Sequence, residues 1–100
     1  MKLECKVAGD FLPERQAILK RFLLFGKTQK VNLVWEHSNQ HDPYAVAVLL
    51  NGKKIGFVPR KISEDVAISL CILKDSEIEI NKEKSGKLFS NLRMAFSEEE

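Results

Sequence analysis

The dipeptide Asn51-Gly52 constrains the fold of this 100-residue chain more than any other feature. It lies between the apolar run 45–50 and the segment 53–58, and Asn-Gly is the strongest short signal for a two-residue turn between antiparallel strands. Both turn residues need a positive φ, which glycine and asparagine adopt most readily. The apolar run has no polar position, so its strand should be covered on both faces. The sequence therefore predicts a buried hairpin in an antiparallel sheet.

The spacing of apolar residues places the remaining strands. Alternation with polar or charged neighbours is typical of a half-buried strand, and it occurs at 2–7, 31–36, 76–81 and 92–96. Short strands with an obligatory antiparallel hairpin favour a small, partly open barrel over a doubly wound or all-helical architecture.

Two helices complete the predicted fold. Apolar side chains repeat at helical spacing through 13–25, where Pro13 suits the first turn and Gly26 the carboxy-terminal end. A second helix is expected to begin at Ser63 as its N-cap and to carry its apolar stripe as far as Leu73. The predicted order is βαβββαββ. The fold class is mainly β with two helices (α+β), a six-stranded, OB-like, partly open antiparallel barrel.

Length and charge narrow the classes of partner. One hundred residues suffice for one domain, predicted at 1–97, and the acidic run 98–100 is expected to be a disordered tail. Residues 1–97 hold 16 basic and 11 acidic side chains, and this net charge of +5 is compatible with a polyanionic partner. The longest apolar run is far shorter than the roughly 20 residues of a bilayer span, and the amino end does not resemble a signal peptide. We therefore expect an intracellular, cytoplasmic protein without a membrane role.

No catalytic, cofactor or metal site is predicted, and the chain is not expected to be an enzyme. The five glycines are isolated, so none belongs to a phosphate-binding loop. His37 and His41 have no cysteine near them in sequence, so a zinc site would need the fold to bring one there. Cys5 and Cys71 belong to no paired motif and are expected to be free, small core residues.

Polar and aromatic residues gather at 39–44, between two predicted strands. Asn39 and Asp42 can accept hydrogen bonds from neighbouring backbone amides, which would make the turn rigid. His41 and Tyr44 place flat, partly polar rings beside it. In one interpretation these residues only stabilise the turn, and in the other they also contact a bound ligand.

A second group of candidate residues follows the hairpin. Gly56, inside a predicted strand, indicates a bulge or the close approach of a ligand. Phe57 either packs in the core or presents its ring to a ligand. Arg60 and Lys61 are either a solvated rim or the cations that meet an anionic partner.

These two groups carry a resemblance to a known family. The pattern N-x-x-D-x-x-A-V-x-V at 39–48, followed by N-G-x-x-I-G-x-V-P-R at 51–60, resembles the HIRAN domain. Upstream, Val7-Ala8-Gly9 followed by Phe11 is similar to the opening strand of that family. The resemblance covers roughly residues 3–97 and implies an OB-like barrel that binds single-stranded DNA, in its best-understood members at a free 3′ end.

The resemblance also implies roles for single residues. Phe11 would stack on a base, and Asp42 would accept a hydrogen bond from the terminal hydroxyl. Arg60 would contact phosphate. Asp10 would place a negative charge next to the stacking ring. The complete set of expected nucleic-acid-binding residues is Phe11, Asn39, His41, Asp42, Tyr44, Phe57, Arg60 and Lys61.

The predicted function is therefore a non-catalytic module that binds single-stranded DNA, including free 3′ ends, in DNA repair or replication-fork processing. HIRAN domains occur in front of fork-remodelling translocases, so a fused or associated helicase or nuclease is an expected partner. The alternative is a protein-interaction adaptor on the same barrel that does not bind nucleic acid. The sequence does not determine the oligomeric state.

Overall fold

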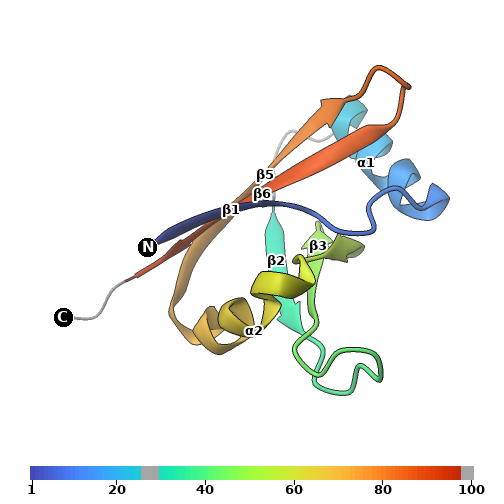
Figure 1. The fold of residues 1–100 in the computed structure, drawn as a ribbon. Helices are drawn as coiled ribbons and strands as arrows, with labels where there is room; N and C mark the ends of the chain where they lie inside the picture. Colours follow the sequence, from blue (N-terminus) through green and yellow to red (C-terminus); the bar gives the residue numbers. More distant parts are fainter. Residues whose placement is uncertain (26–29, 98–100) are drawn as a thin grey trace.

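The computed structural model describes residues 1–25 and 30–97 and shows two helices and six strands (Figure 1). The order βαβββαββ and the mainly β, α+β class are confirmed. The predicted helix end at Gly26 and the predicted tail 98–100 lie outside the described residues. The elements are β1 (Lys2–Lys6), α1 (Pro13–Phe25), β2 (Val31–Trp35), β3 (Val46–Leu50), β4 (Lys53–Phe57), α2 (Arg60–Ser69), the single 3-10 turn η1 (Leu70–Ile72), β5 (Leu73–Lys82) and β6 (Leu88–Phe96).

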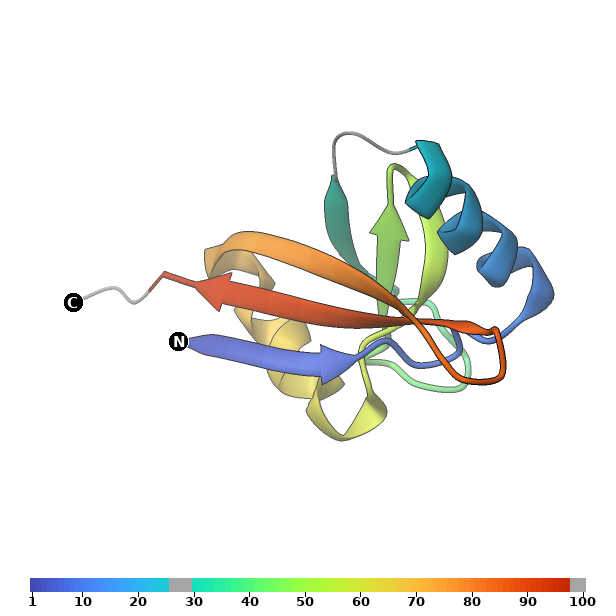
Figure 2. The same cartoon turned by 90° about the horizontal axis from the view of Figure 1, so that it is seen from above.

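The strands form two three-stranded antiparallel sheets, in the orders β1-β6-β5 and β2-β3-β4. Figure 2 shows the long strands of the first sheet crossing the shorter strands of the second. One isolated bridge, between Ala8 and Phe57, joins the two sheets at one corner. At the other corner the Ser76 hydroxyl donates to the Val31 carbonyl at 3.1 Å, a side-chain bond instead of strand pairing. The expected OB-like barrel is therefore not confirmed, because the sheets are not closed into one.

The central hairpin forms as the sequence predicts. Asn51 and Gly52 have φ values of 51° and 82°, so both turn residues adopt positive φ. The pairing of β3 with β4 shifts register between Val48 and Leu49, which places a bulge in β4 at 54–56. Of the apolar run 45–50, only Leu49 is more than slightly exposed. The expectation of a strand covered on both faces is confirmed.

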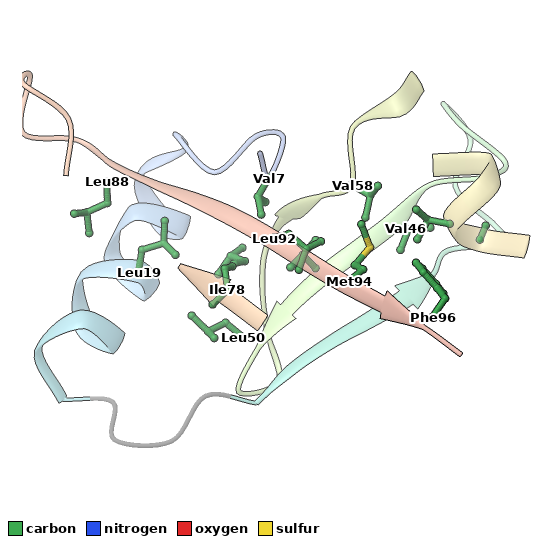
Figure 3. Close-up of a cluster of buried hydrophobic side chains, with 14 residues drawn as sticks. Val7, Leu19, Val46, Leu50, Val58, Ile78, Leu88, Leu92, Met94 and Phe96 are labelled. Atoms are coloured by element: carbon green, nitrogen blue, oxygen red, sulfur yellow. The ribbon is translucent and has the colours of Figure 1, made fainter. Parts of the chain in front are cut away.

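The core lies between the two sheets and is closed by both helices (Figure 3). Leu19 of α1 is fully buried, whereas Ile18 and Phe22 are only partly buried beside it. On the sheet side, Leu92 and Met94 of β6 have almost no exposed surface. Across the described residues, no helix is long and apolar enough to cross a bilayer.

The second helix begins earlier than its sequence pattern predicts. Pro59 precedes the first helical residue, Arg60, and its φ of −53° already suits a helix start. Ser63 is therefore not the N-cap; its hydroxyl donates to the Arg60 carbonyl within the first turn. Leu73 is not helical either, because η1 ends the helix and Leu73 opens β5.

The two cysteines differ in their surroundings. Cys71 lies in η1 and is exposed, so its expected core position is wrong. Cys5 packs partly buried against the core, as expected. Burial disfavours the thiolate and raises the pKa of Cys5 to about 11.

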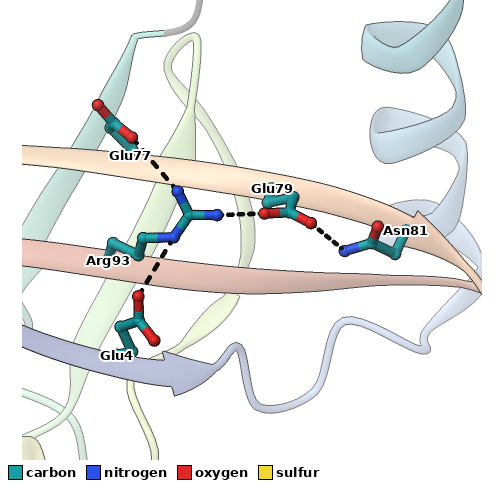
Figure 4. A network of polar contacts seen from close by, with 5 residues as sticks. All are labelled: Glu4, Glu77, Glu79, Asn81 and Arg93. Atoms are coloured by element: carbon teal, nitrogen blue, oxygen red, sulfur yellow. Dashed lines mark hydrogen bonds and ion pairs between the residues drawn. The ribbon is translucent and has the colours of Figure 1, made fainter.

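The outer face of the first sheet carries an ion-pair network (Figure 4). Strand pairing aligns Arg93 of β6 with Glu4 of β1 and Glu77 of β5, and its guanidinium lies 3.4 and 3.6 Å from their carboxylates. The same guanidinium also contacts Glu79. Three carboxylates therefore share one arginine on an exposed strand face, and the cluster retains a net negative charge.

Candidate nucleic-acid interface

The segment between β2 and β3 is a turn closed by its own polar side chains. Where β2 ends and β3 begins, the Glu36 amide donates to the Ala45 carbonyl at 2.8 Å. The Asn39 side-chain oxygen accepts from the amides of His41 and Asp42 at 2.9 and 3.0 Å. One Asp42 oxygen, Oδ1, accepts from the Tyr44 amide. The expected hydrogen bonds from neighbouring backbone amides to Asn39 and Asp42 are therefore confirmed.

The first turn of α2 packs against this segment. Arg60 Nη2 donates to the His41 carbonyl at 3.4 Å, and Ser63 Oγ lies 3.4 Å from Asp42 Oδ2. Both contacts are at the long limit of a hydrogen bond. Asp42 Oδ2 consequently retains the capacity to accept a stronger hydrogen bond from a ligand. The fold thus brings four predicted residues, Asn39, His41, Asp42 and Arg60, to one place.

Aromatic rings stack on the inner side of the turn. Trp35, at the end of β2, stacks on His37 with centroids 4.1 Å apart and on Tyr44 at 6.0 Å. The Trp35 indole N–H also donates to the Pro43 carbonyl at 2.8 Å. Tyr44 is partly buried and packs against the core, so its ring supports the turn.

Two cations lie close to the Phe57 ring. Its ring is partly exposed and does not belong to the core cluster, so the core interpretation of Phe57 is wrong. Lys54 Nζ lies 5.0 Å from the ring centroid, and the Arg15 guanidinium carbon lies 5.5 Å from it. Both distances are within the range of a cation–π interaction.

Glu36 connects Phe57 to the turn. Its carboxylate accepts a 2.5 Å hydrogen bond from Lys54 and a 3.1 Å bond from the Asn39 amide group. The bond from Lys54 is the main reason that the pKa of Glu36 lies below its usual value. Arg15, Phe57, Lys54, Glu36 and Asn39 therefore form a continuous chain of contacts, which we call the Phe57 strip.

Gly56 makes the strip possible by allowing two backbones to approach. A Cβ at this position would lie 2.4 Å from both the Ala8 carbonyl oxygen and the Val7 side chain. That space is occupied by the bridge in which Ala8 and Phe57 exchange hydrogen bonds of 2.8 and 2.9 Å. The close approach predicted for Gly56 is therefore made by this chain's own backbone, and a bulge lies beside it.

Phe11 is exposed at the surface of the loop before α1, with 62% of its area accessible. Among the described residues no ring or cation contact places it against the Phe57 strip. The loop is nevertheless anchored to the strip, because Arg15 Nη1 donates to the Gly9 carbonyl at 2.9 Å. Two residues of chain limit the Cα of Phe11 to about 7.6 Å from that of Gly9.

Asp10 does not stand free beside Phe11. Its Oδ2 accepts from the Ser90 amide and the Ser90 hydroxyl, both at 2.9 Å. Gln16 fixes the same loop by donating to the carbonyls of Asp10 and Leu88. The carboxylate is thus directed at β6, and the loop that presents Phe11 is held by several bonds.

The sequence analysis did not find every residue of this surface. Arg15, Glu36, Lys54 and Trp35 were not selected, because nothing local to any of them indicates which ring or carboxylate it will meet. Lys61 is exposed and has no contact that ties it to the turn. Three surface cavities of the described residues are lined by residues other than the predicted site residues, which lie instead along an exposed strip.

Within residues 1–25 and 30–97, no group of three or more His, Cys, Asp and Glu side chains is placed to hold a metal ion. The raised pKa of Cys5 is the opposite of what an activated thiol needs. The surface offers rings, cations and a carboxylate with a free acceptor position, which are groups for binding.

These features define a small α+β domain with an exposed candidate surface built from a hydrogen-bonded turn, a helix start and a ring near two cations. The chain belongs to the HIRAN domain family, whose model matches residues 16–91. HIRAN domains are in general DNA-binding domains, in agreement with the predicted nucleic-acid binding. The match includes the turn, β4 and Arg60, whereas Phe11 and Arg15 precede it. Comparisons with curated proteins and with solved structures found no match.

Proposed function

We propose that this HIRAN domain is a non-catalytic, intracellular module that binds single-stranded DNA, including free 3′ ends, along the Phe57 strip. It would serve DNA repair or replication-fork processing, fused to or associated with a helicase or nuclease. The observation that carries the proposal is the partly exposed Phe57 ring near Arg15 and Lys54, which is linked through Glu36 to the Asn39–Asp42 turn.

The composition of the strip suits an unpaired strand. Stacking of a base on an aromatic ring is worth about 1–3 kcal/mol and tolerates any base, while cations follow the phosphates. Phe57 supplies the ring, and Arg15, Lys54 and Arg60 supply positive charge. Because Glu36 already pairs with Lys54, that lysine should contribute less to phosphate binding than Arg60, which has no ion pair among the described residues.

The carboxylate of Asp42 supports recognition of an end. A carboxylate repels phosphate but accepts a hydrogen bond from a hydroxyl, and a 3′ hydroxyl exists only at a strand terminus. Asp42 Oδ2 has one long protein contact, so this oxygen can accept from such a hydroxyl. A 3′ phosphate at the same place would meet negative charge.

The test is a fluorescence titration with short labelled oligonucleotides that end in a 3′ hydroxyl or a 3′ phosphate. Binding should weaken with salt with a slope of about −0.7 for each phosphate contacted, for roughly two to four phosphates. The 3′-hydroxyl strand should bind more tightly. No response to any oligonucleotide at low salt would contradict the proposal and favour the adaptor alternative.

Variants locate the site. Phe57→Ala should weaken binding by about 1–3 kcal/mol, and Phe11→Ala should do the same if its ring also stacks on a base. The matched control is Phe89→Ala, because Phe89 of β6 is also partly exposed and has Lys6 at 5.6 Å, but it does not belong to the strip. Arg60→Ala should reduce the salt slope by about 0.7. Equal losses for Phe57→Ala and Phe89→Ala would remove the strip from the binding site.

End recognition has its own variant. Asp42→Asn keeps a side-chain oxygen for the Tyr44 amide but removes the negative charge. We expect the preference for a 3′ hydroxyl over a 3′ phosphate to decrease in this variant, because repulsion of the phosphate is relieved. An unchanged preference would show that Asp42 does not meet the strand end.

A further inference from the structure

The outer surface of α1 carries two large apolar side chains among its charged ones. Leu19 of α1 is fully buried, but Leu23 and Leu24, near the end of the same helix, are 54% and 64% exposed. Lys20 and Arg21 are exposed on the same helix. The described residues leave this side uncovered.

Two grooves, each of about 460 Å³, flank this surface. One lies between α1 and the turn that joins β5 to β6, and its lining includes Leu23, Leu24, Lys20 and Lys82. Figure 1 shows α1 beside that turn. The other lies between α1 and the β3–β4 hairpin and is lined in part by Phe22, Arg21 and Lys53.

The charge around these grooves has one sign. The linings include the cations Lys20, Arg21, Lys53 and Lys82 and no aspartate or glutamate. None of these four cations forms an ion pair with a described residue. Apolar grooves with unpaired positive rims are complementary to a ligand that carries both apolar and acidic groups.

We propose that this face of α1 binds an acidic amphipathic segment of a partner protein, with apolar side chains against Leu23 and Leu24 and carboxylates against the surrounding cations. The proposal does not rest on DNA binding. We refer to Lys20, Leu23, Leu24 and Lys82 as the α1 face.

Two other occupants fit less well. A DNA strand needs rings on which its bases stack, and the α1 face presents aliphatic side chains instead. Leu24 follows Arg15 by nine positions, so helical geometry puts Leu24 about 180° from Arg15 around the axis, whereas Leu23 lies about 80° from it. A second copy of the chain would bring like charges together across a symmetric interface.

The test uses the full chain and a synthetic amphipathic peptide of about four helical turns, with leucines at helical spacing and glutamates between them. In NMR titrations this peptide should shift the resonances of the α1 face and leave those of Asn39 and Asp42 unchanged. A peptide of the same design with lysines in place of the glutamates should not bind. Sedimentation should show that the protein alone remains monomeric.

Variants then assign the contact. The double variant Leu23→Ser/Leu24→Ser should bind the acidic peptide at least about tenfold more weakly, because both leucines lose the apolar area that the peptide would cover. Both leucines are exposed, so folding should be retained. The matched control is Ile68→Ser on α2, which is 61% exposed and should leave the affinity unchanged. Oligonucleotide binding should be the same in all three proteins.

Five results would overturn the proposal. Four of them are no binding of the acidic peptide, equal binding of the lysine peptide, equal affinity in the double variant, and displacement of the acidic peptide by an oligonucleotide. A dimer of the protein that is lost in the double variant would overturn it too, because the occupant would then be a second copy.

Discussion

Gly56→Ala should destabilise the fold without removing any side-chain contact. Gly56 has an ordinary φ, so the backbone conformation itself accepts alanine. The obstacle is space, because the new methyl group would lie 2.4 Å from the Ala8 carbonyl oxygen and 2.4 Å from Val7 Cγ1. A backbone oxygen cannot move aside as the end of a flexible side chain can. The segment 7–8 that follows β1 must therefore shift away from β4.

The cost follows from two terms. Overfilling a packed site costs about 1–3 kcal/mol. Separating the strands also weakens the two hydrogen bonds between Ala8 and Phe57, each worth about 0.5–1.5 kcal/mol. The sum, about 2–6 kcal/mol, is a large part of the 5–15 kcal/mol by which a small domain is stable.

Urea unfolding measures this cost through the fluorescence of Trp35, the only tryptophan of the chain. Gly52→Ala is the matched control, since Gly52 has a φ of +82° but no atom within 4 Å of an added Cβ. That variant should lose only the roughly 1–2 kcal/mol of a left-handed alanine. In Gly56→Ala the amides of Ala8 and Phe57 should also lose protection from hydrogen exchange. A cost no greater than that of Gly52→Ala would refute the reasoning.

Three further predictions concern single side chains. Cys71 should react with iodoacetamide long before Cys5, because Cys71 is exposed and Cys5 is partly buried. The raised pKa of Cys5, about 11, also leaves only about one thiolate in a thousand at pH 8. Equal reaction rates of the two cysteines in timed mass spectrometry would contradict this. Because the pKa of Glu36 is lowered in the folded state, its carboxylate stabilises the fold above pH 4.5, and this stabilisation is lost as the pH falls through the folded-state pKa. In Glu36→Gln the urea midpoint should therefore decrease less than in the wild type as the pH falls below about 4.5. Asp10→Ala should lower the free energy of unfolding by about 1–3 kcal/mol, because it leaves the buried Ser90 amide and hydroxyl without their acceptor. An unchanged thermal midpoint would show that water takes the place of the Asp10 carboxylate.

The local parts of the fold could be predicted because their causes are local. Asn51-Gly52 specifies its own turn through the φ values that those residues tolerate, and the apolar pattern of 13–25 identifies α1 with its observed bounds. The same reasoning was wrong at Ser63 and Cys71. A good cap residue was available at Ser63, but Pro59 starts the helix one turn earlier and the chain leaves the helix before Leu73.

Sheet closure could not be predicted from the strands alone. The number and order of the strands are correct, yet whether two edges pair depends on how far the sheets cross and twist, which no single segment encodes. At one corner the backbones of Ala8 and Phe57 meet, whereas at the other Ser76 reaches Val31 only through its side chain.

The amino-acid sequence by itself determined the elements, the hairpin, the rigid Asn39–Asp42 turn and the family, since each depends on residues that are neighbours or that follow a fixed spacing. Only the tertiary structure decided that Arg15 and Lys54 flank Phe57 and that Leu23 and Leu24 of α1 remain exposed. Contacts between segments far apart in the chain arise when the sheets and helices pack. Which residues share an exposed surface is therefore decided when the sheets and helices pack together, and not when each element forms.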